Sequence, residues 1–329
     1  RSEEGILYDD LVFVPQKYVS KTQLLQKNDI VIAASSGSID IVGKAAPIKE
    51  EFKGSFGAFC KVLRPSSNID PSYLAYFFKT PFYRHTISNL AAGANINNLR
   101  NEHLDNLRIP LPSVESQREI VIFLSKAESA LEKRRETIRL ADEFLKSAFL
   151  EMFGDPIRNT KKWPVRKFED IVYLQRGFDL PVQNRISGQY PVVASNSVVG
   201  YHNEYKVKGP GVITGRSGTI GEVLYIEKDF WPLNTTLFAV DMRGNNPIYL
   251  TYFVRFFRLE RFYRGVGVPT LNRNLVHGEK APLVPFEQQQ KFADLVQKVE
   301  ALKAKQKQSE TELQNLFNCL MQRAFKGYL

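Results

Sequence analysis

The sequence predicts a mixed α/β (α+β) fold with a pseudo-two-fold internal repeat, in which two globular domains alternate with two long helices. Three observations predict it. Motifs recur in the same order in both halves, short β-rich runs punctuated by Gly, Ser and Asn fill each half, and a long helical pattern closes each half. The 329 residues are enough for two domains that each bury a core. We place the domains at residues 1–112 and 155–285 and the helices at 113–154 and 286–329.

The internal repeat relates residues 30–154 to residues 211–327. The matching segments are Val31-Ile32 with Val212-Ile213, Ser36-Gly37-Ser38 with Ser217-Gly218-Thr219, Asp70-Pro71-Ser72-Tyr73 with Asn246-Pro247-Ile248-Tyr249, and Glu115 and Gln117 with Glu287 and Gln289. The second copy has a longer lead-in, from Trp163 to about Tyr201. We therefore expect that the first copy lacks roughly twenty residues at its front, and that the natural start of the chain is missing.

Each half contains a short helix whose start is marked by a capping residue. Asp70 and Asn246 are good N-cap residues, and each precedes a proline at the first helical position. The tetrapeptides that begin with these residues also resemble the N/D-P-P-Y motif of DNA amino-methyltransferases. That motif needs a second proline and a preceding Gly-rich loop for S-adenosylmethionine, and neither is present. Helix capping explains both copies, so we favour it over a methyltransferase site.

The two long helices carry apolar residues at spacings of three and four, which is typical of helices that pack along a seam. The first seam is Ile120, Leu124, Ala127, Leu131, Ile138, Ala141, Leu145, Ala148 and Met152, and the second is Phe292, Leu295, Val299, Leu302, Leu313, Leu316, Leu320 and Ala324. Both turn polar near the middle, at Arg134 and at Gln306 and Ser309. We predict an antiparallel coiled coil within the chain, with helices of about 33 residues and roughly 50 Å. Pairing of each helix with a different subunit is the alternative.

The charge of the chain favours a polyanionic partner. Lys and Arg number 45 against 35 Asp and Glu, a net charge of +10, and basic groups near phosphates release condensed counterions. Charge for solubility alone is the alternative. Four arginines at spacings of three, with aromatic residues between them, would form one basic face of a helix, which either follows a phosphate backbone or is merely solvated: Arg255, Arg258, Arg261 and Arg264.

Signals for catalysis, cofactors and metals are weak or missing. The sequence has no Walker loop, no paired-histidine metal site and no nucleophile elbow. Asp40 followed by Glu51-Phe52-Lys53 loosely matches the Asp…Glu-x-Lys pattern of metal-dependent nucleases, but the second half has no counterpart. No apolar run approaches a membrane span, and nothing resembles a signal peptide. We therefore expect a cytoplasmic protein without a catalytic, cofactor or metal site of its own.

Polar loop residues suited to nucleic acid recur at matching places in both halves. In the first half they are Ser35, Ser36, Ser38, Lys44, Asn95, Asn97, Asn98 and Arg100, and in the second Arg216, Ser217, Thr219, Asn234, Thr235, Thr270, Asn272, Arg273 and Asn274. In the major groove Asn can pair with adenine and Arg with guanine, while Ser, Thr and Lys suit phosphates. Turn formation explains each residue singly, because Asn and Ser bond their own backbone. As a duplicated set, they favour contact with double-stranded DNA.

This plan resembles the specificity subunits of type I restriction–modification systems. The resemblance covers almost the whole chain and rests on the duplicated layout. Its parts are Pro-Leu-Pro with Glu-x-Gln before the first long helix, a second domain that starts at Trp163-Pro164, helices that end in Phe-Gly or Phe-Lys-Gly, and the segments 29–38, 55–60 and 92–98, which look like a first recognition domain.

The resemblance implies a DNA-binding subunit that catalyses nothing alone. Each domain would be a target-recognition domain that reads one half of a bipartite site, and the helices would set the spacer and dock two modification (methyltransferase) subunits. Those partners would bind S-adenosylmethionine and methylate adenine, and restriction subunits would add ATP- and Mg-dependent translocation. If the front of the first domain is missing, as expected above, the reading of its half-site is in doubt. The alternatives are a catalytic DNA methyltransferase or nuclease with an unrecognised active site, and a coiled-coil scaffold that does not bind DNA.

Overall fold

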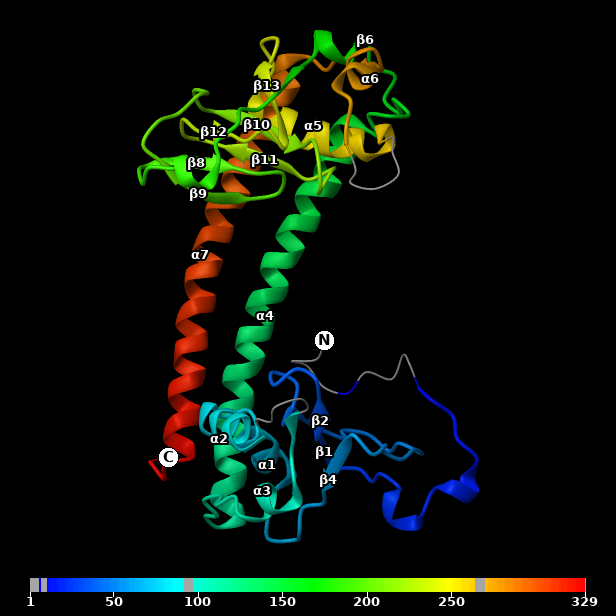
Figure 1. Cartoon of the computed structure of the whole chain (residues 1–329), viewed down its shortest axis with the longest axis vertical. Helices are drawn as coiled ribbons and strands as arrows, with labels where there is room; N and C mark the ends of the chain where they lie inside the picture. Colours follow the sequence, from blue (N-terminus) through cyan, green and yellow to red (C-terminus); the bar gives the residue numbers. More distant parts are fainter. Residues whose placement is uncertain (1–5, 7–10, 92–96, 264–269, 329) are drawn as a thin grey trace. The chain divides into compact units, whose positions relative to one another are not determined.

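The computed structural model describes residues 6, 11–91, 97–263 and 270–328. The chain divides into two compact units (Figure 1). The first unit is Arg1–Arg135 with Gln308–Leu329, and the second is Glu136–Lys307. Each unit therefore holds one mixed α/β domain together with part of both long helices, and each is described by itself below. No helix in the described part of the chain is long and apolar enough to cross a bilayer.

The two long helices are α4 (Val114–Phe153, 40 residues) and α7 (Phe286–Ala324, 39 residues), each longer than the roughly 33 residues expected from the seams. In the first unit, the Nε atom of Arg135 on α4 lies 2.9 Å from a carboxylate oxygen of Glu310 on α7. In the second unit, the rings of Phe153 and Phe292 pack edge to face with their centroids 5.5 Å apart. Higher numbers on α4 thus meet lower numbers on α7, and the antiparallel pairing within the chain is confirmed.

The seam of α7 differs from the expected one near its middle. Leu302 and Leu316 are exposed, by 57% and 50%, whereas Lys303 is buried and Gln306 is half-buried. Lys303 occupies the seam because its long apolar stem packs there while its ammonium group lies 2.6 Å from the carboxylate of Asp142 on α4. The side chain at this seam position is therefore the one that can both pack and form an ion pair with α4. Apolar spacing alone placed Leu302 and Leu316 in the seam wrongly.

In the first unit, a small antiparallel sheet has the strand order β3-β1-β4. Its strands are β1 (Ile30–Ala33), β3 (Ala45–Pro47) and β4 (Cys60–Leu63), and a second pair consists of β2 (Ser35–Ser36) and β5 (Asn97–Asn98). The helices are α1 (Pro71–Phe77), α2 (Pro81–Ala91) and α3 (Asn101–Asp105), with 3-10 turns at Gln16–Tyr18 and Lys21–Gln23. The core forms where Ile30 and Ile32 of β1 pack with Leu74, Phe77 and Tyr83.

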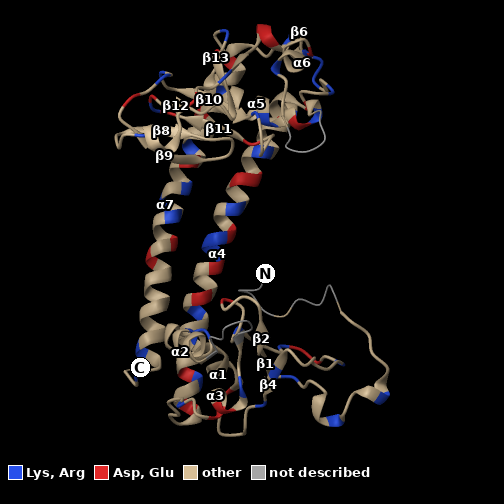
Figure 2. Cartoon of the chain, viewed as in Figure 1, with Lys and Arg blue, Asp and Glu red and all other residues tan. Residues whose placement is uncertain are grey.

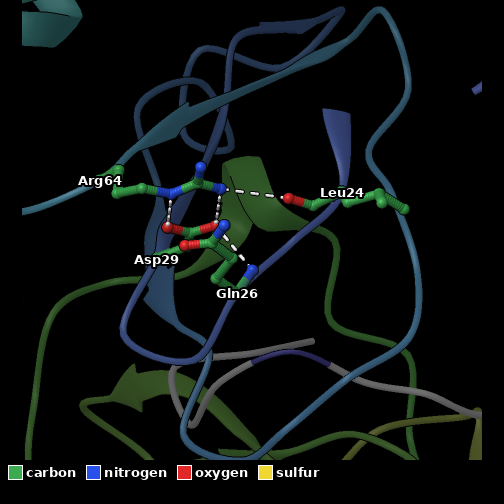
Figure 3. A network of polar contacts seen from close by, with 4 residues as sticks. All are labelled: Leu24, Gln26, Asp29 and Arg64. Carbon is green, nitrogen blue, oxygen red and sulfur yellow. Dashed lines mark hydrogen bonds and ion pairs between the residues drawn. The ribbon is translucent and has the colours of Figure 1, made fainter. Parts of the chain in front are cut away.

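A buried carboxylate anchors the start of β1 (Figure 3). Asp29 is 1% exposed, and Arg64 donates to both of its carboxylate oxygens at 2.8 Å. The backbone amide of Gln26 donates to one of these oxygens at 2.8 Å. Arg64 also donates to the carbonyl of Leu24 at 3.1 Å. Burial alone would raise the pKa of Asp29, but Arg64 and the Gln26 amide outweigh it and hold this pKa below its ordinary value. The network joins β1 to the residue that follows β4.

In the second unit, the main antiparallel sheet has the order β11-β10-β13-β7 and packs against α5 (Figure 1). Its strands are β7 (Tyr173–Arg176), β10 (Gly211–Gly215), β11 (Val223–Ile226) and β13 (Thr236–Asp241). A second sheet has the order β12-β8-β9, with β8 (Tyr190–Val193), β9 (Val198–His202) and β12 (Trp231–Pro232). The remaining elements are the pair β6 (Val165–Lys167) and β14 (Lys280–Pro282), the helices α5 (Pro247–Phe257) and α6 (Arg273–His277), and 3-10 turns at Phe168–Asp170, Val182–Asn184 and Leu259–Phe262.

Both predicted helix caps are confirmed. An Asp70 carboxylate oxygen accepts hydrogen bonds from the amides two and three residues later, at 2.9 and 3.1 Å. The side-chain oxygen of Asn246 accepts the same two bonds at 2.9 and 3.2 Å. These bonds satisfy amides that the first turn of a helix leaves unpaired. Capping therefore accounts for the tetrapeptides that resembled a methyltransferase motif.

The Glu-x-Gln motif has a structural role in each unit. Gln117 on α4 and Gln289 on α7 are almost fully buried, at 0% and 1% exposure. The side-chain oxygen of Gln117 accepts from the backbone amide of Asp70 at 2.8 Å, and that of Gln289 accepts from the backbone amide of Asn246 at 2.9 Å. Each side chain also donates, at 2.9 Å, to a carbonyl in the loop before its own helix. A glutamine amide suits the position because it donates and accepts at once, and it ties each long helix to the cap of a short one.

The expected basic helix face is wrong. Helix α5 ends at Phe257, and Arg258 has a left-handed backbone with φ of 55°, which breaks the helical spacing. The guanidinium of Arg255 donates to the carbonyl of Val223 at 2.9 Å, and that of Arg261 lies 4.5 Å from the ring centre of Phe257. Arg264 lies outside the described residues. These arginines therefore point to different surroundings, and Arg255 and Arg261 hold the domain together.

Candidate nucleic-acid interface

In the second unit, the predicted loop residues gather at one end of the main sheet. Strands β7 and β10 end there and β13 begins there, since Arg176 pairs with Leu237 and Gly215 pairs with Thr236. The amides of the next two residues after β10, Arg216 and Ser217, donate to the carbonyl of Thr235 at 2.8 and 3.2 Å. Four predicted residues therefore share this strand end: Arg216, Ser217, Asn234 and Thr235.

A second segment joins the same strand end. Ser217 forms a β-bridge with Thr270, and the amide of Leu271 donates to the carbonyl of Arg216 at 2.8 Å. Asn272 then caps α6 by accepting from the Asn274 amide at 3.0 Å. Thr270, Asn272 and Asn274 are exposed. Two further predicted residues lie close by in the sequence: half-buried Arg273 at the start of α6 and exposed Thr219 in the loop after β10.

The first unit repeats this arrangement bond for bond. The amides of Ala34 and Ser35 donate to the carbonyl of Phe59 at 2.7 and 3.2 Å, and the Leu99 amide donates to the Ala34 carbonyl at 2.7 Å. Ser35 pairs with Asn98, as Ser217 does with Thr270. Segments that lie far apart in the sequence are thus brought together at the end of β1, as they are at the end of β10.

The predicted residues of the first unit sit around this strand end as follows. Ser36 pairs with Asn97 through the backbone, and the Ser36 hydroxyl accepts from the exposed Ser38 amide at 3.2 Å. Lys44 is exposed, and its carbonyl accepts from the Ala33 amide at 2.9 Å. Arg100 precedes α3, is exposed, and lies 3.2 Å from a carboxylate oxygen of Glu102. Asn95 lies outside the described residues.

The bonding pattern shifts the alignment of the two copies by one residue. It makes Ser35 the counterpart of Ser217, whereas motif matching paired Ser36 with Ser217. Likewise Ala34 is the counterpart of Arg216. The motif alignment is wrong here because both loops are rich in Ser and Gly, so a slip of one residue still matches letters, whereas strand pairing admits one register.

Three residues at these strand ends were missed by the sequence reasoning. Phe59 is 72% exposed and is the counterpart of Thr235. Asp179 accepts a hydrogen bond from the Asn234 side-chain amide through a carboxylate oxygen, and Arg176 lies 3.9 Å from the same oxygen. No sequence signal identified the last two, because neither belongs to a motif that the two halves share. An aromatic residue in a short segment with Ser and Gly, residues 55–60, was the available sequence signal for Phe59.

The charge excess of the chain lies outside the long helices. Along α4 and α7 basic and acidic residues alternate and nearly cancel (Figure 2). The net charge of +10 therefore comes from the domains and their loops. Among the described residues, no three His, Cys, Asp or Glu side chains gather as a group that could hold a metal ion. The basic excess thus lies in the parts of the chain that carry the strand ends.

Known proteins share both sequence and fold with the chain. Residues 5–140 and 160–315 match the family described as the type I restriction modification DNA specificity domain. The specificity subunit of the type I restriction enzyme StySPI from Salmonella potsdam is 38% identical over 163 residues, which is 50% of this chain and 35% of that protein. The EcoKI specificity subunit of Escherichia coli K12 is 40% identical over 162 residues, 49% of this chain and 34% of that protein. The match spans about a third of the length of these relatives.

Solved structures agree in fold. The S subunit of a type I restriction–modification system from M. genitalium has a TM-score of 0.59 at 18% identity, covering 92% of this chain and 84% of that one. A chain from a structural study of complex assembly in the type I system has a TM-score of 0.62 at 15% identity, covering 93% and 83%. Since the family match extends over most of the sequence, the chain belongs to the type I restriction–modification DNA specificity family.

Proposed function

We propose that this chain is the specificity subunit of a type I restriction–modification complex and reads a bipartite target in double-stranded DNA. The observation that carries the proposal is the strand-end arrangement, which one chain builds twice with the same backbone hydrogen bonds. A bipartite target needs two comparable reading surfaces. The two recognition domains, for which we keep the boundaries 1–112 and 155–285, each supply one.

The chemistry of the strand ends supports base reading. Backbone groups there are already bonded to one another, so the loops hold their shape without a ligand. Exposed or half-exposed side chains then present amides, hydroxyls and a guanidinium, notably Asn98, Arg216 and Asn234. Arg pairs with guanine and Asn with adenine in the major groove, and hydroxyls and Lys44 suit phosphates. We assign the duplicated polar set to DNA contact on these grounds.

The charge distribution supports the same assignment. Binding to DNA depends on counterion release by basic groups near phosphates. The long helices are nearly neutral overall, so the basic excess is placed where the proposal needs it, in the domains. The helices, at 113–154 and 286–329, instead offer mixed-charge surfaces, which we assign to docking two modification subunits and the restriction subunits.

Catalysis in this proposal belongs to the partners. The modification subunits would bind S-adenosylmethionine and methylate adenine, and the restriction subunits would use ATP and Mg for translocation. This chain would bring them to a chosen sequence, in the cytoplasm and without a membrane. The family match and the relatives named above support this division of labour.

The test is methylation by the modification subunits with and without this chain. Sequencing that maps methylated adenines should find a two-part sequence with a fixed gap only when the chain is present. Undiminished site-specific methylation in its absence would refute the proposal. Duplex binding that is indifferent to sequence and disappears with salt would instead identify a scaffold held to DNA by charge alone.

A further inference from the structure

The lead-in of the second domain lies tightly against the strand end. The Gly177 amide donates to the carbonyl of Thr236 at 3.1 Å, and the Phe178 amide donates to that of Pro232 at 2.8 Å. A Cβ atom on Gly177 would lie 2.2 Å from the Leu233 carbonyl oxygen, which is too close for any side chain. Glycine therefore permits this approach, and the backbone around it fixes where the following residues stand.

This approach sets a carboxylate beside a predicted base-reading side chain. Asp179 accepts a hydrogen bond from the side-chain Nδ2 of Asn234. An Nη atom of Arg176 lies 3.9 Å from the same carboxylate oxygen. The Asp179 side chain is 69% exposed, so the group stands at the surface. Asn234 directly precedes Thr235, whose carbonyl holds the loop after β10.

The carboxylate decides which way the amide of Asn234 faces. An ionised carboxylate can only accept, so the amide must turn its NH₂ group toward Asp179 and its oxygen away. The NH₂ group has a second hydrogen, so one donor and one acceptor are left. Adenine offers the complementary pair, an N7 acceptor and an N6 donor, whereas guanine offers two acceptors at this edge.

We propose that Asn234 reads an adenine in the second half-site and that Asp179 is the positioning residue that holds the Asn234 amide in the adenine-reading orientation. This inference rests on the proposed function, because it assigns one base contact within it. It also explains why a negative group stands at a surface that meets phosphates. Asp179 weakens general attraction to DNA, and in exchange it holds the Asn234 amide in the orientation that matches adenine.

The experiment uses the full chain in complex with its modification subunits. The probe is a library of DNA duplexes with random sequence, and the bound fraction is sequenced to obtain the base preference at every position. Three variants are compared with the unchanged chain: D179N, N234A and the control D241N. Asp241 is matched because it lies at the opposite end of the same sheet, pairs with Arg243 at 2.8 Å, and loses the same charge in D241N.

In the unchanged chain, one position of the second half-site should favour adenine by about 10- to 100-fold. N234A should remove this preference among all four bases, with the first half-site unaffected. D179N should lower the adenine-to-guanine ratio about tenfold through weaker binding of adenine, because an amide at residue 179 accepts or donates and no longer fixes Asn234 in the orientation that matches adenine. Affinity of D179N for random duplexes should stay equal or rise, since a negative charge is lost. D241N should keep the ratio.

Three results would overturn the inference. They are an unchanged adenine-to-guanine ratio in D179N, an unchanged preference in N234A, and a loss of preference at every position of D179N together with a lower unfolding temperature, which marks a folding role. Each of these leaves the proposed function standing, because the unchanged chain still selects a sequence. An unchanged chain without any sequence preference would refute the proposed function itself.

Discussion

At the end of β10 the second unit presents Arg216 and Thr235, whereas the matching positions of the first unit hold Ala34 and Phe59. The bonds that define these positions join backbone amides to backbone carbonyls, so they form with any side chain. The two units therefore share the backbone arrangement at the strand end, which we call the frame, and differ in the side chains that the frame carries. An exposed side chain on this frame, such as Phe59, can vary at little cost in folding, whereas Ala34 is buried in the core at 3% exposure. In the proposed function, variation of the exposed positions would change the sequence that is read.

The structural equivalence of the two units is tested most strongly at the buried glutamines. Gln117→Ala and Gln289→Ala should each destabilise their own unit by about 2–4 kcal/mol, since each leaves buried amides and carbonyls without a partner. Both tryptophans, Trp163 and Trp231, lie in the second unit. Urea unfolding followed by tryptophan fluorescence should therefore report Gln289→Ala directly, and circular dichroism should report both variants. A large effect from one glutamine and none from the other would show that the two units are not equivalent.

The difference between the side chains at the two strand ends is tested next at Arg216. Arg216→Ala should relax the preference for guanine at one position of the second half-site, at a loss of about 1–3 kcal/mol if the contact is bidentate. The measurement is base preference from selected duplexes, as above. Replacing the counterpart by Ala34→Ser should leave both half-sites nearly unchanged, because this side chain is buried at 3% exposure and cannot contact DNA. Equal weakening of Arg216→Ala on all sequences would mark a phosphate contact instead.

Phe59 tests whether the first unit reads with apolar contacts. Its 72% exposed ring adds little to folding, and an apolar group at this place suits the methyl group of thymine. Phe59→Ala should lower a thymine preference in the first half-site by about 1 kcal/mol, and should change the free energy of unfolding by only about 0.5 kcal/mol. Phe59→Thr, which copies residue 235, should retain part of that preference. A drop in stability without a change in preference would make Phe59 a structural residue.

The units also differ in the titrating groups that anchor them. Asp29 in the first unit has a pKa held below its ordinary 3.8, while burial lowers the pKa of His277 in the second unit below its ordinary 6.5. His277 accepts from the Leu174 amide at 3.1 Å, which requires an unprotonated Nε2. A lowered pKa gives stability that is complete above the unfolded value and falls as the pH drops below it.

Mild acid should therefore act on the second unit first. Between about pH 7 and pH 5 its unfolding midpoint, followed by tryptophan fluorescence, should fall slightly, whereas the contribution of Asp29 should persist until the pH drops below its ordinary pKa. His277→Gln, which keeps an acceptor but cannot titrate, should flatten that pH dependence. An equal slope in the variant would show that other groups cause it.

Local interactions are what the sequence alone determined. The caps at Asp70 and Asn246 and the seam of α4 depend on residues within a few positions of one another, so residue type and spacing suffice. The duplication added the order of the domains, because two copies of one plan can be compared without knowing either structure. The length of the helices and the seam of α7 were less well predicted, since Lys303 enters the seam only where Asp142 on α4 meets its ammonium group.

Tertiary structure alone decided which distant segments meet. Ser35 and Asn98 pair across the first domain, and Asp179 reaches Asn234 only because Gly177 lets one backbone lie against another. These contacts join residues with long stretches of chain between them, and their register is chosen by the packing of the whole domain. Spacing in the sequence does not predict which distant segments pair. Bringing them together costs the entropy of closing a long loop, and all the contacts of the folded domain offset that cost together. The candidate residues could thus be named from the sequence, but their grouping at a strand end could not.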